Sequence, residues 1–597
     1  MTPDSVHLLT RSSQMSLFRD GKGRVRRAYY GARLHEPEDA FSDSASAPLL
    51  CTTLADSLDG LPNASGEYDL CITQADGSLS LCLECERQEV VRLDEDREEA
   101  VFYLKDPAYP VRVEVHVRAH SESGVFMQWT VIRNEGEEGI RIHRAASGHL
   151  NLKAERYFVT SFRGTWGGES LMSEEEVARG HELVLASGTG TRAAQEGSPG
   201  FIISLDGPAP EDSGEVIMGA VAWPGNYRIW FRHSPYHYLY AGAGMDVAPA
   251  PYVLDAGGVL ETPPVILAWS GEGKGEASRS MHRWARRYGL RGGDEERMTL
   301  LNSWEGVYFT FTEDVLHGMM KRAADLGIEL FVLDDGWFGN RFPRNDARAG
   351  LGDWFVNPEK FPGGLDELIG NVNALGMDFG LWVEPEMVNP DSDLYRAHPD
   401  WTYHFPHRHA DELRHQLVLN MTRSDVQAYI LDCLDRLLTD HNIRYIKWDM
   451  NRPFSQVGAE NLADPKMYSY LHTMAVYRIV DELKRRHPAV QFESCASGGG
   501  RCDLGAISHF DQVWTSDNTD GIDRMTIQKG YSMLHPIKTM RAWVTDIAGI
   551  NKPCSLDFRF HIAMQGALGL GGNLEKYSPE ELEICRRNVA LYKAVSY

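Results

Sequence analysis

The chain has 597 residues, of which 43% are hydrophobic and 24% are charged, and its formal net charge is −25 at pH 7. This length exceeds what one hydrophobic core supports and predicts two or three domains, with a composition typical of a soluble globular protein. The negative charge argues against nucleic acid or an anionic membrane as the main partner, because both require a basic surface.

The first residues, MTPDSVHLLTRSSQ, contain no apolar signal core, and the sequence nowhere holds the roughly 18 consecutive apolar residues of a membrane-spanning helix. Its nine cysteines are an odd number, thinly spread over a long chain. Such a pattern is typical of reduced thiols rather than of a disulfide framework. We therefore expect a cytoplasmic protein with no membrane partner.

Residues 1–290 are dominated by short stretches in which apolar and polar residues alternate, such as LSLCLECE, VRVEVHVRAH and YRIWFRH. A period of two is that of a strand with one buried and one exposed face, and turn residues separate the stretches. Helical patterns are almost absent until a short basic stretch, MHRWARRYG, which follows GEGKGEASRS. This region predicts an N-terminal antiparallel β-sandwich domain that ends in a connecting helix.

Residues 291–597 alternate between strand and helix patterns. Eight strands alternating with helices over about 300 residues predict a catalytic (β/α)8 TIM barrel, with a doubly wound open sheet as the alternative. Neither G-x-G-x-x-G nor a Walker motif occurs, so the usual marks of nucleotide binding are missing. The predicted strands cover residues 299–304, 329–334, 378–384, 444–449, 490–495, 512–516, 541–545 and 566–571.

Polar residues collect where five of these strands end, and the active site of a TIM barrel lies at that edge. Tryptophans among carboxylates, with few basic groups, favour a sugar ligand, because aromatic faces stack on its C–H surface while carboxylates accept its hydroxyl protons. Carboxylates alone could instead hold Mg²⁺, which remains an alternative. The residues at these strand ends are Asp334, Asp335, Trp337, Trp382, Glu384, Glu386, Lys447, Asp449, Asn451, Glu493, Cys495, Trp514, Asp517 and Asp520.

Six stretches resemble the α-galactosidases of glycoside hydrolase family 36: LDDGWF, LGDWFVNPEKFPGGL, FGLWVEPEMVNPDSDLYRAHPDW, YIKWDMNR, ESCASGGGR and WTSDNTD. The resemblance implies a retaining exo-α-galactosidase that acts on raffinose-type and melibiose-type substrates without a cofactor or a metal. It also implies a homo-oligomer such as a tetramer. Members of this family usually continue into a C-terminal β-domain, which we expect to be absent because the sequence ends at ALYKAVSY.

Retaining glycosidases use two carboxyl groups about 5 Å apart, one as nucleophile and one as acid and then base. By the match of motifs, Asp449 of KWDMN would be the nucleophile and Asp517 of SDNTD the acid/base. Asp449 must stay ionised, and Lys447, two residues earlier on the same strand face, would stabilise its charge.

The resemblance also implies the contacts with the sugar. Asp334 and Asp335 would bind the O4 and O6 hydroxyls, and Trp382 would form a wall beside the ring. Arg414 would lie next to it, although its segment LRHQLVLN departs from the family pattern. The remaining contacts implied are Lys447, Asn451, Cys495 and Trp514, whereas Glu384, Glu386 and Glu493 are expected to brace the site.

Several alternatives stay open at this point. The same scaffold serves α-N-acetylgalactosaminidases and galactosyl transferases, and a protein that only binds sugars would look similar. Cys495 disfavours the acetamido sugar, because it stands where the family contacts the C2 hydroxyl. Four histidines could suggest a metal site, but their charged, proline-containing segment predicts an exposed loop: His404, His407, His409 and His415.

Overall fold

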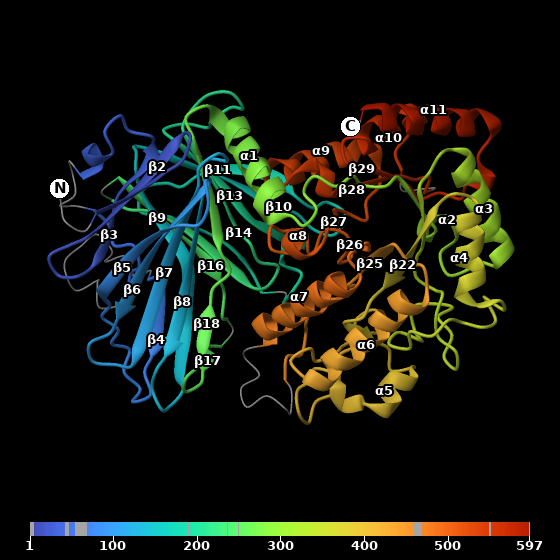
Figure 1. Ribbon diagram of the computed structural model, residues 1–597, viewed down its shortest axis with the longest axis horizontal. Helices are drawn as coiled ribbons and strands as arrows, with labels where there is room; N and C mark the ends of the chain where they lie inside the picture. The colour runs from blue at the N-terminus through green and yellow to red at the C-terminus, as the bar shows by residue number, and fades with distance from the viewer. Residues whose placement is uncertain are drawn as a thin grey trace.

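The computed structural model describes residues 5–41, 47–53, 68–188, 190–235, 237–248, 250–458, 468–547 and 551–595. Its two parts lie side by side, with β-sheets in the blue to green half of the chain and a barrel with surrounding helices in the green to red half (Figure 1). Within the described residues, no helix has the length and apolar character needed to cross a bilayer.

The N-terminal domain is built from antiparallel sheets of ten, six and three strands. The ten-stranded sheet contains β5 (Glu84–Arg92), β6 (Arg97–Lys105), β7 (Val111–His120), β8 (Val125–Asn134), β10 (Tyr157–Arg163), β11 (Leu171–Glu176), β13 (Gly197–Leu205), β14 (Val216–Val221), β18 (Val259–Glu261) and β19 (Val265–Ser270). The six-stranded sheet contains β4 (Leu70–Thr73), β9 (Ile140–Lys153), β12 (Glu182–Ser187), β15 (Tyr227–His233), β16 (Tyr238–Met245) and β17 (Tyr252–Leu254). Strands β1 (Ser5–Leu9), β2 (Ser13–Arg19) and β3 (Val25–Ala32) form the third sheet.

Strand β7 shows why this region forms a sandwich. Its valines at 111, 113, 115 and 117 are buried, while the polar residues between them are partly exposed. Apolar side chains from the two larger sheets form one cluster between them, so each sheet has one face in the core. The predicted antiparallel β-sandwich is confirmed.

Helix α1 (Gly273–Trp284) and one π-helical turn (Ala285–Gly289) connect the two domains. The helix begins earlier than predicted, inside the stretch GEGKGEASRS, which we expected to lead into it. Its small residues allow a close approach to the sandwich: a Cβ at Gly275 would lie 2.9 Å from the Glu211 carbonyl oxygen. The boundary that we predict at residue 290 falls between this connector and the first barrel strand.

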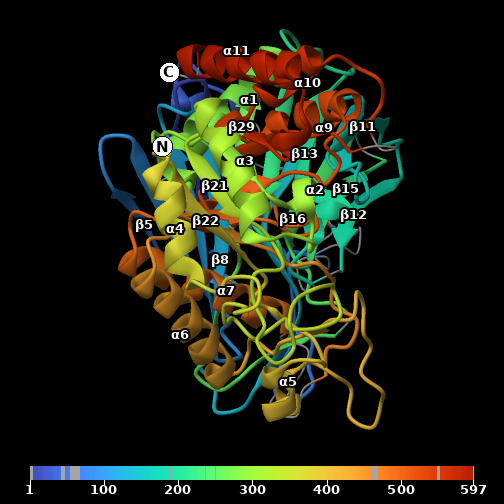
Figure 2. The same ribbon diagram turned by 90° about the vertical axis from the view of Figure 1, so that its right-hand side faces the viewer.

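The C-terminal domain is a closed barrel of eight parallel strands. The first strand pairs with the last, which rules out the open sheet and confirms the TIM barrel. Figure 2 shows two neighbouring barrel strands, β21 (Leu330–Leu333) and β22 (Asp378–Val383), with the following helices nearby. All eight fall on the predicted stretches: β20 (Leu300–Asn302), β21 (Leu330–Leu333), β22 (Asp378–Val383), β25 (Tyr445–Trp448), β26 (Gln491–Ser494), β27 (Gln512–Trp514), β28 (Met540–Val544) and β29 (Ala567–Leu570).

Helices cover the outside of the barrel. They are α3 (Glu313–Asp325), α4 (Gly364–Ala374), α6 (Ser424–Asp440), α7 (Tyr468–Arg486), α8 (Ala506–His509), α9 (Gly521–Leu534), α10 (Leu556–Ala563) and α11 (Pro579–Val595). The one-turn helix α2 (Trp304–Val307) instead lies at the carboxyl end of the first barrel strand. Between β22 and α6 the chain inserts β23 (Met387–Val388), α5 (Asp393–Ala397) and β24 (Leu417–Val418), and the two strands pair as a small antiparallel sheet.

The two domains share a buried apolar cluster. Phe162 and Ile202 of the sandwich belong to the same cluster as Leu504, Tyr531 and Leu534 of the barrel. Strand β13 and helix α9 approach so closely that a Cβ at Gly200 would lie 2.2 Å from a methyl carbon of Leu534. The sandwich is therefore packed firmly against one side of the barrel, near the strand ends that hold the polar residues.

Candidate active site

A cavity of about 240 Å³ opens at the carboxyl ends of the barrel strands. All ten residues predicted for the site line it, so the structure brings them together although their roles stay predictions. The lining residues are Trp166, Trp304, Glu305, Tyr308, Asp334, Asp335, Trp382, Arg414, Lys447, Asp449, Asn451, Cys495, Trp514, Asp517, Trp543 and Ile547.

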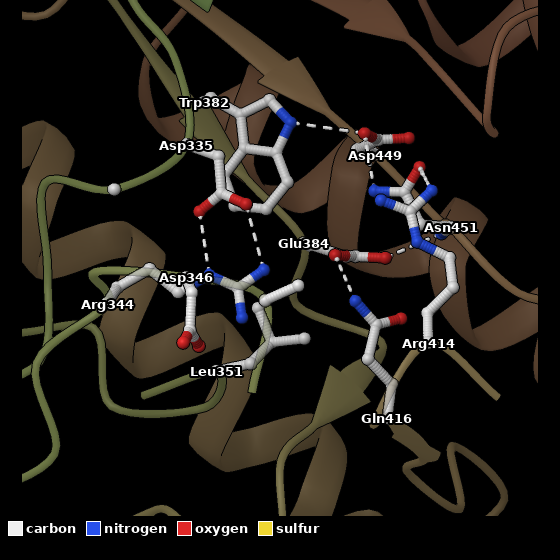
Figure 3. A network of polar contacts seen from close by, with 12 residues as sticks. Asp335, Arg344, Asp346, Leu351, Trp382, Glu384, Arg414, Gln416, Asp449 and Asn451 are labelled. Carbon is white, nitrogen blue, oxygen red and sulfur yellow. Dashed lines mark hydrogen bonds and ion pairs between the residues drawn. The ribbon is translucent and has the colours of Figure 1, made fainter. Parts of the chain in front are cut away.

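Asp449 lies directly after β25 and is held by four hydrogen-bond donors. Its Oδ2 accepts from Trp382 Nε1 at 3.2 Å and from Asn451 Nδ2 at 2.7 Å, as Figure 3 shows. Its Oδ1 accepts from the backbone N–H groups of Met450 at 2.8 Å and Ser497 at 3.3 Å. Burial alone would raise the pKa of Asp449, but the charge of Lys447 and hydrogen bonds from Cys495 and Asn451 hold it below its ordinary value. The site thus keeps an ionised carboxylate in a buried position.

Lys447 contacts Asp334 directly, with its Nζ 2.8 Å from Oδ2. Asn302 also donates to this oxygen, at 2.7 Å. Burial would lower the pKa of Lys447, but the carboxylates around it, Asp334 first, raise it well above its ordinary value. Lys447 is therefore a fixed cation between the Asp334 and Asp449 charges. Its positive charge offsets these carboxylates and explains how a buried strand can end in so many ionisable groups.

Asp335 forms a two-pronged ion pair with Arg344, at 2.9 Å and 2.8 Å (Figure 3). Both side chains are buried, and Arg344 also donates to Asn389 and to the Ala349 carbonyl. Burial raises the pKa of Asp335 even though the Arg344 charge lowers it. The pair fixes the orientation of Asp335 at the cavity wall.

Glu384 lies beneath the Asp449 side of the cavity and braces it. It accepts hydrogen bonds from Gln416 Nε2 at 3.0 Å and from the backbone N–H of Asn451 at 2.5 Å. Burial, followed by the charge of Asp449, raises the pKa of Glu384 to about 8. A neutral acid here avoids a second negative charge beside Asp449.

Glu386 and Glu493 are fully buried below the cavity. Glu386 accepts from Trp448 and pairs with His472 at 2.8 Å and Arg501 at 2.9 Å. Burial would raise its pKa, but Arg501 and His472 lower it to about 2. Glu493 accepts from the Tyr445 hydroxyl. Neither residue lines the cavity, in agreement with the bracing role expected for them.

Arg414 reaches the cavity from the inserted segment between β22 and α6. Its guanidinium donates to Asn451 Oδ1 at 3.3 Å, and that oxygen also accepts from Ser497 Oγ at 2.9 Å. Arg414 and His415 both have positive φ values, of 56° and 60°. Consecutive left-handed residues other than glycine are uncommon and mark a backbone conformation held by its surroundings.

Asp517 follows β27 on the other side of the cavity and is half-buried. Two indole groups donate to it, Trp514 to Oδ1 and Trp166 to Oδ2, each at 2.9 Å. Trp514 stacks on Trp543, with ring centroids 4.0 Å apart. Trp166 comes from the N-terminal domain, which therefore contributes directly to the site.

Sequence reasoning missed the lining residues outside the matched motifs. Trp304 and Glu305 follow the first barrel strand, so the rule that polar residues gather at strand ends could have found them. Trp543 lies near the end of β28 and Ile547 follows that strand, so the same rule could have led to this strand end. Trp166 carried no signal, because nothing in its local sequence relates it to the barrel.

Glu305 is the fifth acidic residue that lines the cavity, with Asp334, Asp335, Asp449 and Asp517. Burial, followed by the charge of Asp517, raises its pKa to about 8. Its Oε2 is buried and has no hydrogen-bond partner among the described residues. Gly571 makes room for this carboxyl group, since a Cβ there would lie 3.1 Å from Oε2.

Asp520 and the four histidines between residues 404 and 415 do not line the cavity. Asp520 caps helix α9, accepting from the N–H groups of Ile522 and Asp523 at 3.0 Å, so its place after β27 reflects a helix start. Across the described part of the chain, no three His, Cys, Asp or Glu side chains are grouped to hold a metal ion. The histidines 404, 407, 409 and 415 lie in the predicted loop, with all but His404 exposed.

Residues 259–597 match the sequence profile of Melibiase, and residues 23–255 match that of the Glycosyl hydrolase family 36 N-terminal domain. The chain is 36% identical to alpha-galactosidase AgaA of Geobacillus stearothermophilus over 85% of its own length and 69% of that protein's length. It is also 36% identical to alpha-galactosidase C of Emericella nidulans, over 78% of this chain and 62% of that relative. The chain thus spans a little less than two thirds of the length of some of the relatives that it matches.

The structure of AgaA superimposes with a TM-score of 0.92 at 30% identity, covering 99% of this chain and 86% of AgaA. Variants of AgaA have been crystallised in complex with raffinose and with stachyose. The two profile matches, the sequence identity and the shared architecture all lead to the same family, and together they extend from the sandwich to the last barrel strand. The chain is a glycoside hydrolase and belongs to family 36, the family of these α-galactosidases.

Proposed function

We propose that the protein is a retaining exo-α-galactosidase that removes terminal α-galactosyl residues from oligosaccharides. One observation carries the proposal: a single cavity is lined by Asp449, fixed as a buried anion, and by a second carboxyl group, Asp517. A retaining glycosidase requires one nucleophilic carboxylate and one acid/base in the same pocket.

In the first step, a carboxylate oxygen of Asp449 attacks the anomeric carbon while the bond from that carbon to the leaving oxygen breaks. Asp517 transfers its proton to the leaving oxygen and becomes an anion. The product is a β-galactosyl ester of Asp449, so the configuration is inverted once. The donors around Asp449 orient its carboxylate for this attack.

In the second step, the Asp517 anion takes a proton from water as the water oxygen attacks the same carbon. The ester bond to Asp449 breaks, Asp449 returns to an anion, and Asp517 is protonated again. Two inversions give a product with retained α-configuration.

The substrate class rests on the charges of the cavity and on the relatives. Asp334 and Asp335 offer carboxylate acceptors to sugar hydroxyls, and the cavity is a pocket in which one terminal sugar can bind. The AgaA complexes with raffinose and stachyose support α-galactosides of that type as substrates. A homo-oligomeric state and a cytoplasmic location stay predictions.

The test is the rate of nitrophenol release from 4-nitrophenyl α-galactoside by the wild type and by Asp449→Ala, in EDTA, with and without azide. We expect an active wild type, and a variant slowed by at least about 10³-fold that azide restores while forming β-galactosyl azide. If the protein cleaves only the corresponding α-N-acetylgalactosaminide, its substrates are α-N-acetylgalactosaminides and not α-galactosides. No cleavage of either glycoside would leave a sugar-binding protein as the better reading.

A further inference from the structure

The carboxyl group of Asp517 receives an N–H donor on each of its two oxygens. Trp514 of the barrel donates to Oδ1 and Trp166 of the N-terminal domain donates to Oδ2. An indole nitrogen is a donor only. An ionised carboxylate is a strong acceptor for both donors, whereas in a protonated carboxyl group the oxygen that carries the proton is a weaker acceptor for its indole.

The two indoles differ in their freedom to move. Trp514 is 2% exposed, stacks on Trp543 and lies under Arg524, whose guanidinium carbon is 4.7 Å from the ring centroid. Trp166 is 64% exposed. Only the Trp166 side chain can therefore leave Asp517 without disturbing the barrel.

The backbone that carries Trp166 is fixed to the barrel. The residues from Gly164 to Ser170 form a short loop, which we call the docking loop, between β10 and β11. Glu169 of this loop is fully buried and accepts a hydrogen bond from Ser516 Oγ, while Asn518 Nδ2 donates to the Gly167 carbonyl at 2.9 Å. The backbone on the C-terminal side of Trp166 is thus held against the barrel, while the indole itself is exposed.

Gly498 allows this docking. Its φ is +82°, and a Cβ there would lie 2.7 Å from the backbone nitrogen of Asp517 and 2.9 Å from Glu169 Oε1. The glycine-rich turn after β26 therefore leaves space for the docking loop beside the acid/base.

We propose that Trp166 is a positioning residue for the acid/base: its indole N–H holds the Asp517 anion and leaves Oδ2 when that oxygen carries the proton. This inference rests on the proposed function, which gives Asp517 both protonation states. In the first step the proton on Oδ2 passes to the leaving oxygen. In the second step the N–H stabilises the anion until it accepts a proton from water.

Trp166→Phe tests the proposal, because it keeps an aromatic ring and removes the N–H. Without that donor the anion is less stabilised, so Asp517 should retain its proton to higher pH. We expect the alkaline limb of the kcat/KM profile for melibiose or raffinose to move up by about 0.5 to 1 pH unit. For 4-nitrophenyl α-galactoside, whose leaving group needs little acid assistance, kcat should fall about three- to tenfold if hydrolysis of the ester limits the rate.

The matched control is Trp269→Phe. Trp269 also donates its indole N–H to a carboxylate of the N-terminal domain, Glu215 Oε1 at 2.8 Å, but it does not line the cavity. Its removal should leave the pH profile unchanged. Both substitutions leave in place the ionisable groups that face Asp517, namely Glu169, Arg192, Glu305, Cys495 and Arg524.

Two kinetic results would overturn the proposal. An unchanged alkaline limb in an active Trp166→Phe enzyme would mean that the N–H does not act on Asp517. Equal loss of activity at every pH and for both leaving groups would mean that Trp166 only lines the cavity and does not position Asp517.

A measurement that does not depend on turnover separates this proposal from the proposed function. With ¹⁵N-labelled tryptophan, the indole signal of Trp166 is the one that Trp166→Phe removes. We expect this signal to shift with pH in the wild type and to stop shifting in Asp517→Asn. A shift in a protein that cleaves no α-galactoside would reject the function and keep the coupling, whereas a signal constant from pH 4 to 9 would reject the coupling.

Discussion

Glu305 is a partly buried acid with one fully buried carboxyl oxygen, Oε2, and its pKa of about 8 gives the protein a pH dependence that an exposed glutamate would not. An unfolded chain releases this proton near pH 4.5, so between pH 4.5 and about 8 the folded state holds the extra proton. Stability therefore falls as pH rises through this window, by an amount on the order of a few kcal/mol.

Glu305→Gln should remove this dependence. The wild-type protein is expected to lose more thermal stability between pH 5 and pH 8 than the variant does, as measured by the shift in Tm. Glu137→Gln, on an exposed turn, is the control and should follow the wild type. Parallel Tm curves for all three proteins would show that Glu305 is ionised in the folded state.

The ion pair between Asp335 and Arg344 also contributes to stability in a way that a single substitution can test. Arg344→Leu leaves a buried carboxylate without its cation, which costs about 3 to 5 kcal/mol in the free energy of unfolding. Arg341→Leu is the control, because Arg341 is 73% exposed at its side chain and pairs with Asp393 only at 3.6 Å. We expect its cost in denaturant unfolding to stay below about 0.5 kcal/mol. A similar cost for both would mean that water reaches Asp335.

At the scale of elements, the turn after β26 and the docking loop form one unit. Gly498→Ala adds a Cβ that would contact both Asp517 and Glu169, and it also strains a left-handed backbone. We expect kcat/KM to fall by at least about tenfold because the acid/base is displaced.

Gly376→Ala separates the two causes. Gly376 has nearly the same φ, +80°, but a Cβ there would meet nothing within 4 Å. Both variants should lose about 1 kcal/mol of stability through backbone strain, with a further loss in Gly498→Ala from its close contacts, and only Gly498→Ala should lose activity. Equal activities would show that the docking loop adapts to the added methyl group.

The elements themselves were largely predictable. The eight barrel strands are short apolar runs bounded by polar residues, and nine of the ten predicted residues that line the cavity lie in the matched motifs. The tenth, Arg414, lies in the segment that departs from the family pattern. Asp520 follows the same strand-end pattern but caps a helix, since local sequence does not distinguish a cap from a site residue. Trp166 and the pKa of Glu305 depend on burial and on contacts between distant segments, which a local pattern does not contain.

At the scale of the whole molecule, one apolar cluster joins the sandwich and the barrel. Leu534→Ala would open a cavity in this cluster and should destabilise the protein by about 2 to 5 kcal/mol. Because both domains share the cluster, we expect calorimetry to show one transition that moves to lower temperature as a whole. Leu591→Ala, at a residue 47% exposed on α11, should leave it unmoved. Two separate transitions in the variant would mean that the domains unfold independently.

Trp166 and Asp517 are separated by 351 positions in the chain. A ribosome adds about 5 to 20 residues per second, so the sandwich leaves the exit tunnel tens of seconds before the acid/base is even synthesised. The Trp166–Asp517 contact cannot form until the sixth barrel strand, β27, and the Asp517 that follows it have been synthesised. The domain made first therefore carries its indole before the carboxyl group that this indole binds exists, and the site is completed only when the later strands of the barrel fold against the sandwich.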